Sequence, residues 1–123
     1  MGYSITEAAE KIHLSTYTLR YYDKMGLLPF VERNDLGNRD FKEKDLELLE
    51  LICCLKNTGM SIKQIREVIA LCLKGDNTLE IRREIFIRHR EEVLNQIAEL
   101  HKNLHKINCK INYYDSICSK NIK

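Results

Sequence analysis

The segment STYTLRYYDKMGLL, residues 15–28, combines hydroxyl, guanidinium and phenol groups within one short stretch. In a helix, four of these polar and aromatic side chains fall on one face at i, i+3, i+4 and i+7: Tyr17, Arg20, Tyr21 and Lys24. An arginine guanidinium is a rigid fork of donors suited to phosphate or guanine, and a tyrosine hydroxyl donates to phosphate oxygens. The pattern therefore favours a nucleic-acid-binding helix over one that is only solvated.

Local signals define this helix and the one before it. Ser15 is a natural N-cap, and Gly26 is a natural terminator. Upstream, Ser4 and Glu7 form a capping-box pattern that predicts a short amphipathic helix over residues 5–12. The opposite face of the second helix would pack on the core through Thr18, Leu19, Tyr22 and Met25. Two short helices joined by the brief turn HLS predict a helix-turn-helix.

Residues 27–41 change character, because they mix turn formers with residues suited to extended backbone. The turn formers are Pro29, Asn34, Asp35, Gly37 and Asn38. We expect a small β-hairpin, or wing, that reaches the backbone or minor groove of DNA next to the helix. The expected DNA contacts are Thr16, Tyr17, Arg20, Tyr21, Tyr22 and Lys24 in the helix and Arg33, Asn34 and Arg39 in the wing, with Asn38 at the hairpin tip.

Two further helices are expected after the wing. Asp40 with Glu43 reads as the start of a third helix that runs to about Asn57 and is closed by Gly59. A fourth helix would begin after Ser61, with Gln64 completing a capping box. Its apolar face is formed by Ile62, Ile65, Val68, Ile69 and Cys72.

Gly75 and the polar run GDNT mark the one plausible domain boundary. Beyond it, a seam of apolar residues follows alternating steps of four and three, which is typical of a coiled coil. The expected dimer seam is Val93, Ile97, Leu100, Leu104, Ile107, Ile111 and Tyr114, continuing to Cys118. A helix over residues 79–118 would be about 60 Å long, so its stripe cannot be buried by so small a domain. We expect a second copy of the chain to cover it.

Composition limits the remaining possibilities. The 123 residues allow one small domain with an extension, and the formal net charge of +2 points to no diffuse basic surface. Residues 1–40 carry five basic and six acidic side chains, so DNA affinity would have to come from aimed contacts. The sequence contains no membrane-length apolar run, signal peptide, phosphate loop or nucleophile motif, so we expect a cytoplasmic protein that is not an enzyme and needs no cofactor or resident metal.

The motifs YSITEAAEKIHLSTYTLRYYDKMGLLP, NDLGNRDF and GMSIKQIREV, followed by a long terminal helix, resemble the MerR family of bacterial transcription regulators. This resemblance implies a mainly α fold: a winged helix-turn-helix DNA-binding domain over 1–75, an antiparallel coiled-coil dimerisation helix over 76–118, and a short tail over 119–123. It also implies a homodimer on a promoter palindrome that bends and untwists double-stranded DNA, and so acts on RNA polymerase indirectly. No membrane partner is implied.

The signal that such a regulator would sense is left open among several possibilities. The segments RDFKEKDLELLELICCLKNTGM, KGDNTLEIRREI and KINYYDSI resemble the aldehyde- and thiol-stress-responsive MerR subgroup, in which a lone cysteine at the position of Cys54 is the sensor. The doublet with Cys53 departs from that single-cysteine pattern. A metal-responsive regulator would instead use Cys109 and Cys118, with imidazoles from His101 and His105. A coiled-coil adaptor without DNA binding is the remaining alternative.

Overall fold

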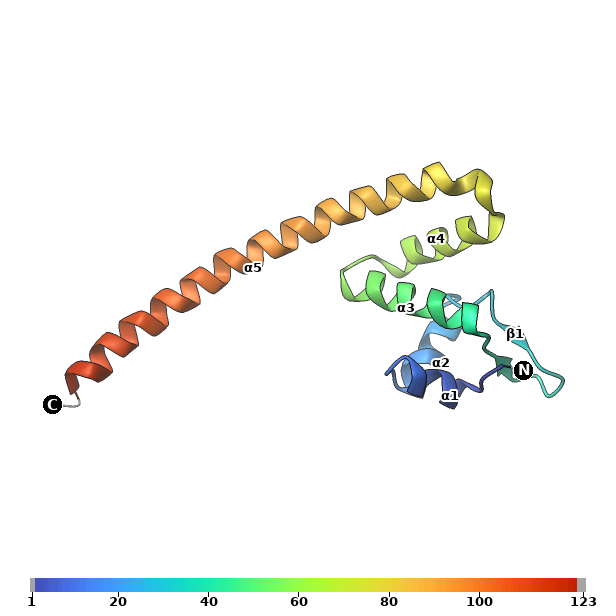
Figure 1. Cartoon of the computed structure of the whole chain (residues 1–123), viewed down its shortest axis with the longest axis horizontal. Coiled ribbons are helices and arrows are strands. Elements are labelled where there is room, and N and C mark those ends of the chain that lie inside the picture. The colour runs from blue at the N-terminus through green and yellow to red at the C-terminus, as the bar shows by residue number, and fades with distance from the viewer. Residues whose placement is uncertain (1, 122–123) are drawn as a thin grey trace. The chain divides into compact units, whose positions relative to one another are not determined.

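The computed structural model describes residues 2–121. In chain order its elements are α1 (Ile5–Lys11), α2 (Thr16–Lys24), β1 (Glu32–Arg33), β2 (Arg39–Asp40), α3 (Glu43–Asn57), α4 (Ile62–Lys74), the 3₁₀ helix η1 (Asp76–Thr78) and α5 (Leu79–Asn121) (Figure 1). The chain divides into two compact units, one ending at Ile85 and the other beginning at Phe86. The mainly helical class with a small hairpin and a long terminal helix is as predicted. None of the helices in residues 2–121 has the length and apolarity needed to cross a membrane.

The first two helices begin at the expected caps. Ser4 Oγ accepts from the Glu7 N–H at 3.2 Å, and Glu7 Oε1 accepts from the Ser4 N–H at 2.9 Å, which completes the capping box. Ser15 Oγ accepts from the Thr18 N–H at 3.1 Å at the start of α2. Gly26 follows α2 with a φ of 78°, a backbone conformation that favours glycine. The helix-turn-helix is therefore built from local hydrogen bonds that the sequence makes predictable.

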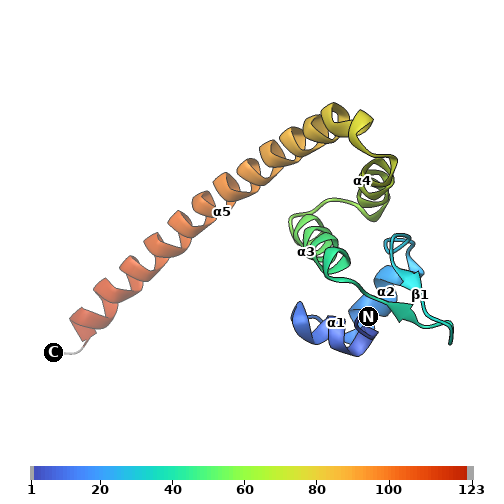
Figure 2. The same cartoon turned by 45° about the vertical axis from the view of Figure 1, so that its right-hand side comes forward.

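The hairpin is short and lies beside α2 in both views (Figures 1 and 2). β1 and β2 are antiparallel, with Glu32 opposite Asp40 and Arg33 opposite Arg39. The turn is held by the Asn34 side chain, whose Oδ1 accepts from the backbone N–H groups of Leu36 at 3.0 Å and Asn38 at 3.1 Å. This is the Asx-type bonding that makes asparagine a turn former.

The start of α3 corrects one prediction. Asp40 does not cap a helix with Glu43, because it lies in β2 and its carboxylate pairs with the Lys42 ammonium. Phe41 then forms a β-bridge with Tyr3, so the backbone stays extended up to this point. The cap is Lys42, whose N–H donates to Asp45 Oδ2 at 2.9 Å, and α3 then runs to Asn57 as expected.

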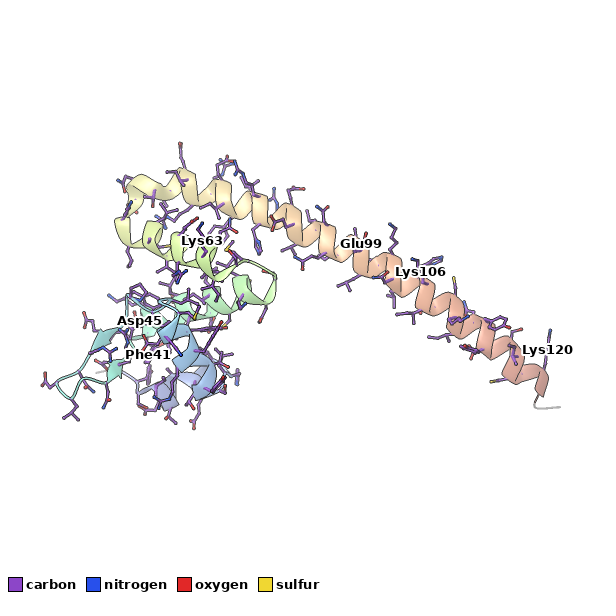
Figure 3. The ribbon with its side chains drawn as sticks, turned by 180° about the vertical axis from the view of Figure 1, so that it is seen from behind. Phe41, Asp45, Lys63, Glu99, Lys106 and Lys120 are labelled. Carbon is purple, nitrogen blue, oxygen red and sulfur yellow. The ribbon has the colours of Figure 1, made fainter. Side chains whose placement is uncertain are left out.

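The core of the first unit joins α1, α2, α3, α4 and the segments that flank the hairpin. The largest completely buried side chains are Leu19, Leu27, Leu28, Phe41, Leu49, Ile52, Ile65, Val68 and Ile69. The N-cap of α4 is Ser61, whose Oγ accepts from the Gln64 N–H at 3.1 Å, and three residues of the predicted apolar face of α4 are buried. Figure 3 labels Phe41 and Asp45, which mark where the chain passes from the hairpin into α3. This core fixes α2 with one face inward and one face in solvent.

The second unit is the part of α5 from Phe86 onward. The helix continues without interruption through Cys118, as its apolar periodicity predicts. Val93 is half-buried, and the rest of the expected seam, from Ile97 to Tyr114, is 45–67% exposed in the single chain. Figure 3 shows side chains on both edges of this helix and labels Glu99, Lys106 and Lys120 along it. Within one chain, the apolar stripe of this unit is left largely uncovered.

Candidate nucleic-acid interface

The exposed face of α2 carries the predicted polar and aromatic set. Tyr17 is 80% exposed and Tyr21 is 41% exposed. Arg20 and Lys24 are also exposed, whereas Thr16 is half-buried at the first turn of the helix. Leu19 on the opposite face is completely buried, which anchors the helix in the core. The sequence periodicity thus divides α2 correctly into a packed face and a solvent face.

Tyr22 lies in the core, as its place on the packing face of α2 predicts, and not on the exposed face with the other expected DNA contacts of the helix. It is only 5% exposed, and burial, helped by its neighbour Cys53, raises the pKa of the Tyr22 hydroxyl to about 12. Its position is two residues beyond Arg20, which places it on the opposite side of the helix. Tyr22 therefore belongs to the packing between α2 and α3 and drops out of the exposed set.

The hairpin presents its predicted residues in different ways. Arg33 is exposed and donates from Nη1 to the Gly37 carbonyl at 2.8 Å, which lays it over the turn. Asn34 is exposed, but its side-chain oxygen is already used to hold the turn together. Arg39 is half-buried and forms an ion pair with Asp23 of α2 at 2.7 Å.

A groove of about 550 Å³ runs between the start of α1, α2 and the hairpin. It brings together Arg20 from α2 with Arg33 and Asn38 from the hairpin, although these residues are far apart in the sequence. The groove also contains carboxylates, among them Asp23 and Asp40, each of which is paired with a basic side chain. Because Asp23 and Asp40 are paired, they repel a polyanion only weakly, and the exposed cations of the groove can bind it.

Sequence reasoning missed two residues that hold α2 in place. Asp23 is the α2 partner of Arg39, and Arg66 of α4 donates from Nη1 to the Met25 carbonyl at 3.0 Å, at the C-terminal end of α2. The Arg66 contact suits the helix dipole, because a cation there lies near unsatisfied carbonyls. These contacts span 16 and 41 residues, so no local pattern could have identified either one.

The cysteines lie in different environments. Cys54 is exposed on α3, whereas Cys53 is half-buried. Burial is the main reason why the pKa of the Cys53 thiol is raised. On α5, Cys109 and Cys118 are exposed, and Cys109 Sγ lies 3.7 Å from His105 Nε2. Among the described residues, no group of three or more potential ligands is placed to hold a metal ion.

Comparison with known proteins agrees with this architecture. The family described as MerR HTH family regulatory protein matches residues 3–72, and the family described as MerR, DNA binding matches residues 46–108. An uncharacterised HTH-type transcriptional regulator of Haemophilus influenzae is 48% identical over 114 residues, which are 93% of this chain and 84% of that protein. The HTH-type transcriptional regulator AdhR of Bacillus subtilis is 38% identical over 91 residues, which are 74% of this chain and 65% of that protein.

Two solved structures are similar over nearly the whole chain. One is HiNmlR, a MerR family regulator lacking the sensor domain, bound to promoter DNA, with a TM-score of 0.85, 47% identity and coverage of 94% of this chain and 92% of that one. The other is a MerR family transcriptional regulator from Bacillus thuringiensis, with a TM-score of 0.85, 44% identity and coverage of 90% and 97%. These relatives are transcriptional regulators, not enzymes. This chain belongs to the MerR family of helix-turn-helix DNA-binding transcriptional regulators.

Proposed function

We propose that the protein binds a promoter palindrome as a homodimer, with α2 and the hairpin of each copy on one half-site. The observation that carries this proposal is the exposed face formed by Tyr17, Arg20, Tyr21 and Lys24. Arg20 of this face lines one groove together with Arg33 of the hairpin. Arginine and tyrosine at such a helix can reach phosphates and base edges in the major groove, while a wing contacts the adjacent backbone. The similar protein HiNmlR was solved bound to promoter DNA, which supports the same class of target here.

The homodimer rests on α5. Its seam is exposed over about five turns in the single chain, and a long apolar stripe of this kind is normally covered in a coiled coil. We assign residues 1–75 to DNA binding, residues 76–118 to dimerisation through an antiparallel coiled coil, and residues 119–123 to a short tail. Residues 122 and 123 of that tail lie outside the described part of the chain.

Two-fold symmetry gives the dimer its regulatory action. A fixed pair of DNA-reading helices selects two half-sites at one spacing, so a promoter with an overlong spacer can be held only by bending or untwisting it. The distorted promoter then presents the two promoter elements on either side of the spacer to RNA polymerase. The effect on polymerase is indirect, because it acts through the shape of the DNA. Distortion is measurable as a change in energy transfer between dyes at the two ends of the operator fragment.

The DNA-binding proposal is tested on the fragment upstream of the protein's own gene. Fluorescence anisotropy should give specific binding by the wild-type protein and at least about tenfold weaker binding by Arg20→Ala, because a charged contact to phosphate or guanine is lost in each copy. Lys102→Ala is the matched control, since it removes an exposed cation from α5 and should leave affinity within about twofold. Equal affinity of wild type and Arg20→Ala would contradict the proposal.

For the signal, we propose that Cys54 reacts with aldehydes or other electrophiles. Its exposure supports this role, as does the resemblance of the surrounding segments to the aldehyde- and thiol-stress-responsive subgroup. The thiolate would add to a carbonyl carbon, and the carbonyl oxygen would take up a proton, giving a hemithioacetal without any oxidant. A thiol at this place in α3 sits next to Cys53, which packs against the DNA-reading helix through Tyr22.

Promoter activation by an added aldehyde tests the sensor. Cys54→Ser should abolish the response while leaving operator affinity unchanged, because the substitution replaces only an exposed sulfur. Cys118→Ser is the matched control, since it also removes an exposed thiol and should respond normally. A normal response in Cys54→Ser together with a lost response in Cys118→Ser would move the sensor to α5.

A further inference from the structure

Arg39 of the hairpin has most of its hydrogen-bonding capacity committed within the first unit. Its Nε donates to Asp23 Oδ2 at 3.2 Å, and its Nη2 donates to Asp23 Oδ1 at 2.7 Å. Its Nη1 donates to the carbonyl of Val31, the residue before β1. All three guanidinium nitrogens are therefore engaged, and the side chain is only 18% exposed.

Arg39 and the two partners of its guanidinium lie on three separate pieces of backbone. Asp23 is in the last turn of α2, Val31 precedes β1 and is 3% exposed, and Arg39 is itself in β2. The hairpin has strands of only two residues each, so its own ladder gives little rigidity. A bidentate arginine–carboxylate pair restricts both distance and orientation, which a single lysine contact would not do.

On this basis we propose that Arg39 and Asp23 are positioning residues, which fix the hairpin against α2 at the spacing that lets both reach one DNA half-site. Arg39 then makes no phosphate contact of its own, in contrast to the expectation from the sequence. The proposal rests on the proposed DNA-binding function, because the spacing matters only if both elements bind the same duplex. We call the two residues the helix–wing bracket.

The alternative is that Arg39 binds phosphate and that Asp23 competes with the DNA for it. The two possibilities predict opposite results for Asp23→Asn. If Arg39 is a DNA contact, losing the competing carboxylate frees it and binding becomes tighter. If the pair is a bracket, the same variant binds more weakly, by about fivefold to twentyfold, even though it removes a negative charge from a DNA-facing surface.

The matched control for charge is Asp35→Asn, which removes one carboxylate from the exposed turn of the same hairpin. It should bind operator DNA as tightly as wild type or slightly more tightly. Arg39→Lys provides a second variant, because lysine keeps the charge but cannot span the Asp23 carboxylate and the Val31 carbonyl together. The bracket predicts a loss of affinity in Arg39→Lys similar to that in Asp23→Asn, whereas a simple charge contact predicts affinity within about twofold of wild type.

A double variant separates positioning from general damage to the fold. Arg33→Gln should weaken operator binding in the wild-type background, because it removes an exposed cation of the hairpin. In the Asp23→Asn background the same change should have little further effect, since the hairpin is already misplaced. Additive losses in the double variant would overturn the bracket. Circular dichroism and thermal unfolding verify that each variant is folded at the temperature of the binding assay.

The outcomes also distinguish this inference from the proposed function. If wild type and Asp35→Asn both fail to bind the upstream fragment, DNA binding at this site is refuted. If both bind and Asp23→Asn binds as tightly as wild type or more tightly, only the bracket is refuted. Weaker binding by both Asp23→Asn and Arg39→Lys, with non-additive loss in the Arg33→Gln double variant, supports the bracket.

Discussion

The affinity of the dimer for its operator should fall steeply with salt, by an amount that follows from the cations left exposed beside the groove. Arg20, Lys24 and Arg33 are exposed, whereas Arg39 is held by Asp23. A two-fold dimer presents three such cations from each copy, and each neutralised phosphate contributes about 0.9 to the slope of log affinity against log salt. Six phosphate contacts give a slope of about −5, or about a thousandfold loss between roughly 50 and 200 mM salt.

Substitutions test the source of this slope. Arg20→Gln should make the slope less negative by about 2, because one contact disappears from each copy of the dimer. Arg39→Gln should weaken binding without changing the slope, since its charge is already paired within the protein. Fluorescence anisotropy titrations at four or more salt concentrations measure both. A wild-type slope near −2, or a change of about 2 in Arg39→Gln, would refute the assignment of contacts.

Three further predictions concern stability and assembly. Burial raises the pKa of Tyr22 to about 12, so ionisation of this hydroxyl opposes folding at high pH. In urea titrations, the free energy of unfolding should fall as pH rises from about 10 towards 12, and it should fall less in Tyr22→Phe. Arg82 donates to Thr78 Oγ1 at 3.0 Å and to the Gly75 carbonyl at 3.1 Å. Arg82→Met should therefore lower the free energy of unfolding by about 2 kcal/mol in urea titrations at fixed protein concentration. Arg83 is exposed, so Arg83→Met should lower it by less than about 0.5 kcal/mol. Leu104→Asp should raise the dimer dissociation constant at least about a hundredfold in sedimentation equilibrium, whereas the neighbouring Asn103→Asp should change it little; an unchanged Leu104→Asp dimer would remove the seam from the interface.

Local rules predicted most of the fold because most of its boundaries are made by short-range hydrogen bonds. The caps at Ser4, Ser15 and Ser61 each join residues three apart, so the local sequence pattern is enough to predict the hydrogen bond. The capping signal at Asp40 failed for the opposite reason. Pairing of β2 with β1 and the bridge between Phe41 and Tyr3 hold the backbone extended there, and these contacts join distant parts of the chain.

The candidate site divides in the same way. The helical period separated the exposed Tyr17 and Arg20 from the buried Leu19, because the exposure of each residue depends only on the face of α2 on which it lies. The helical period could not reveal that Arg39 pairs with Asp23, because this ion pair forms only when the hairpin folds back on α2. The helix and hairpin patterns suggested four cations for DNA, and three of them are exposed, because Arg39 is paired with Asp23.

This reduction matters because the DNA-reading part of the chain has little positive charge to spare. Residues 1–40 carry five basic and six acidic side chains, so long-range attraction to DNA is weak and one half-site alone would be bound poorly. Using Arg39 to hold the hairpin gives up a phosphate contact in exchange for a fixed geometry. Losing this contact favours binding only if two copies with the same fixed geometry bind two half-sites at a set spacing. An isolated fragment of residues 1–85 should therefore bind operator DNA far more weakly than the full chain, and adding a second, unlinked fragment should not restore the affinity.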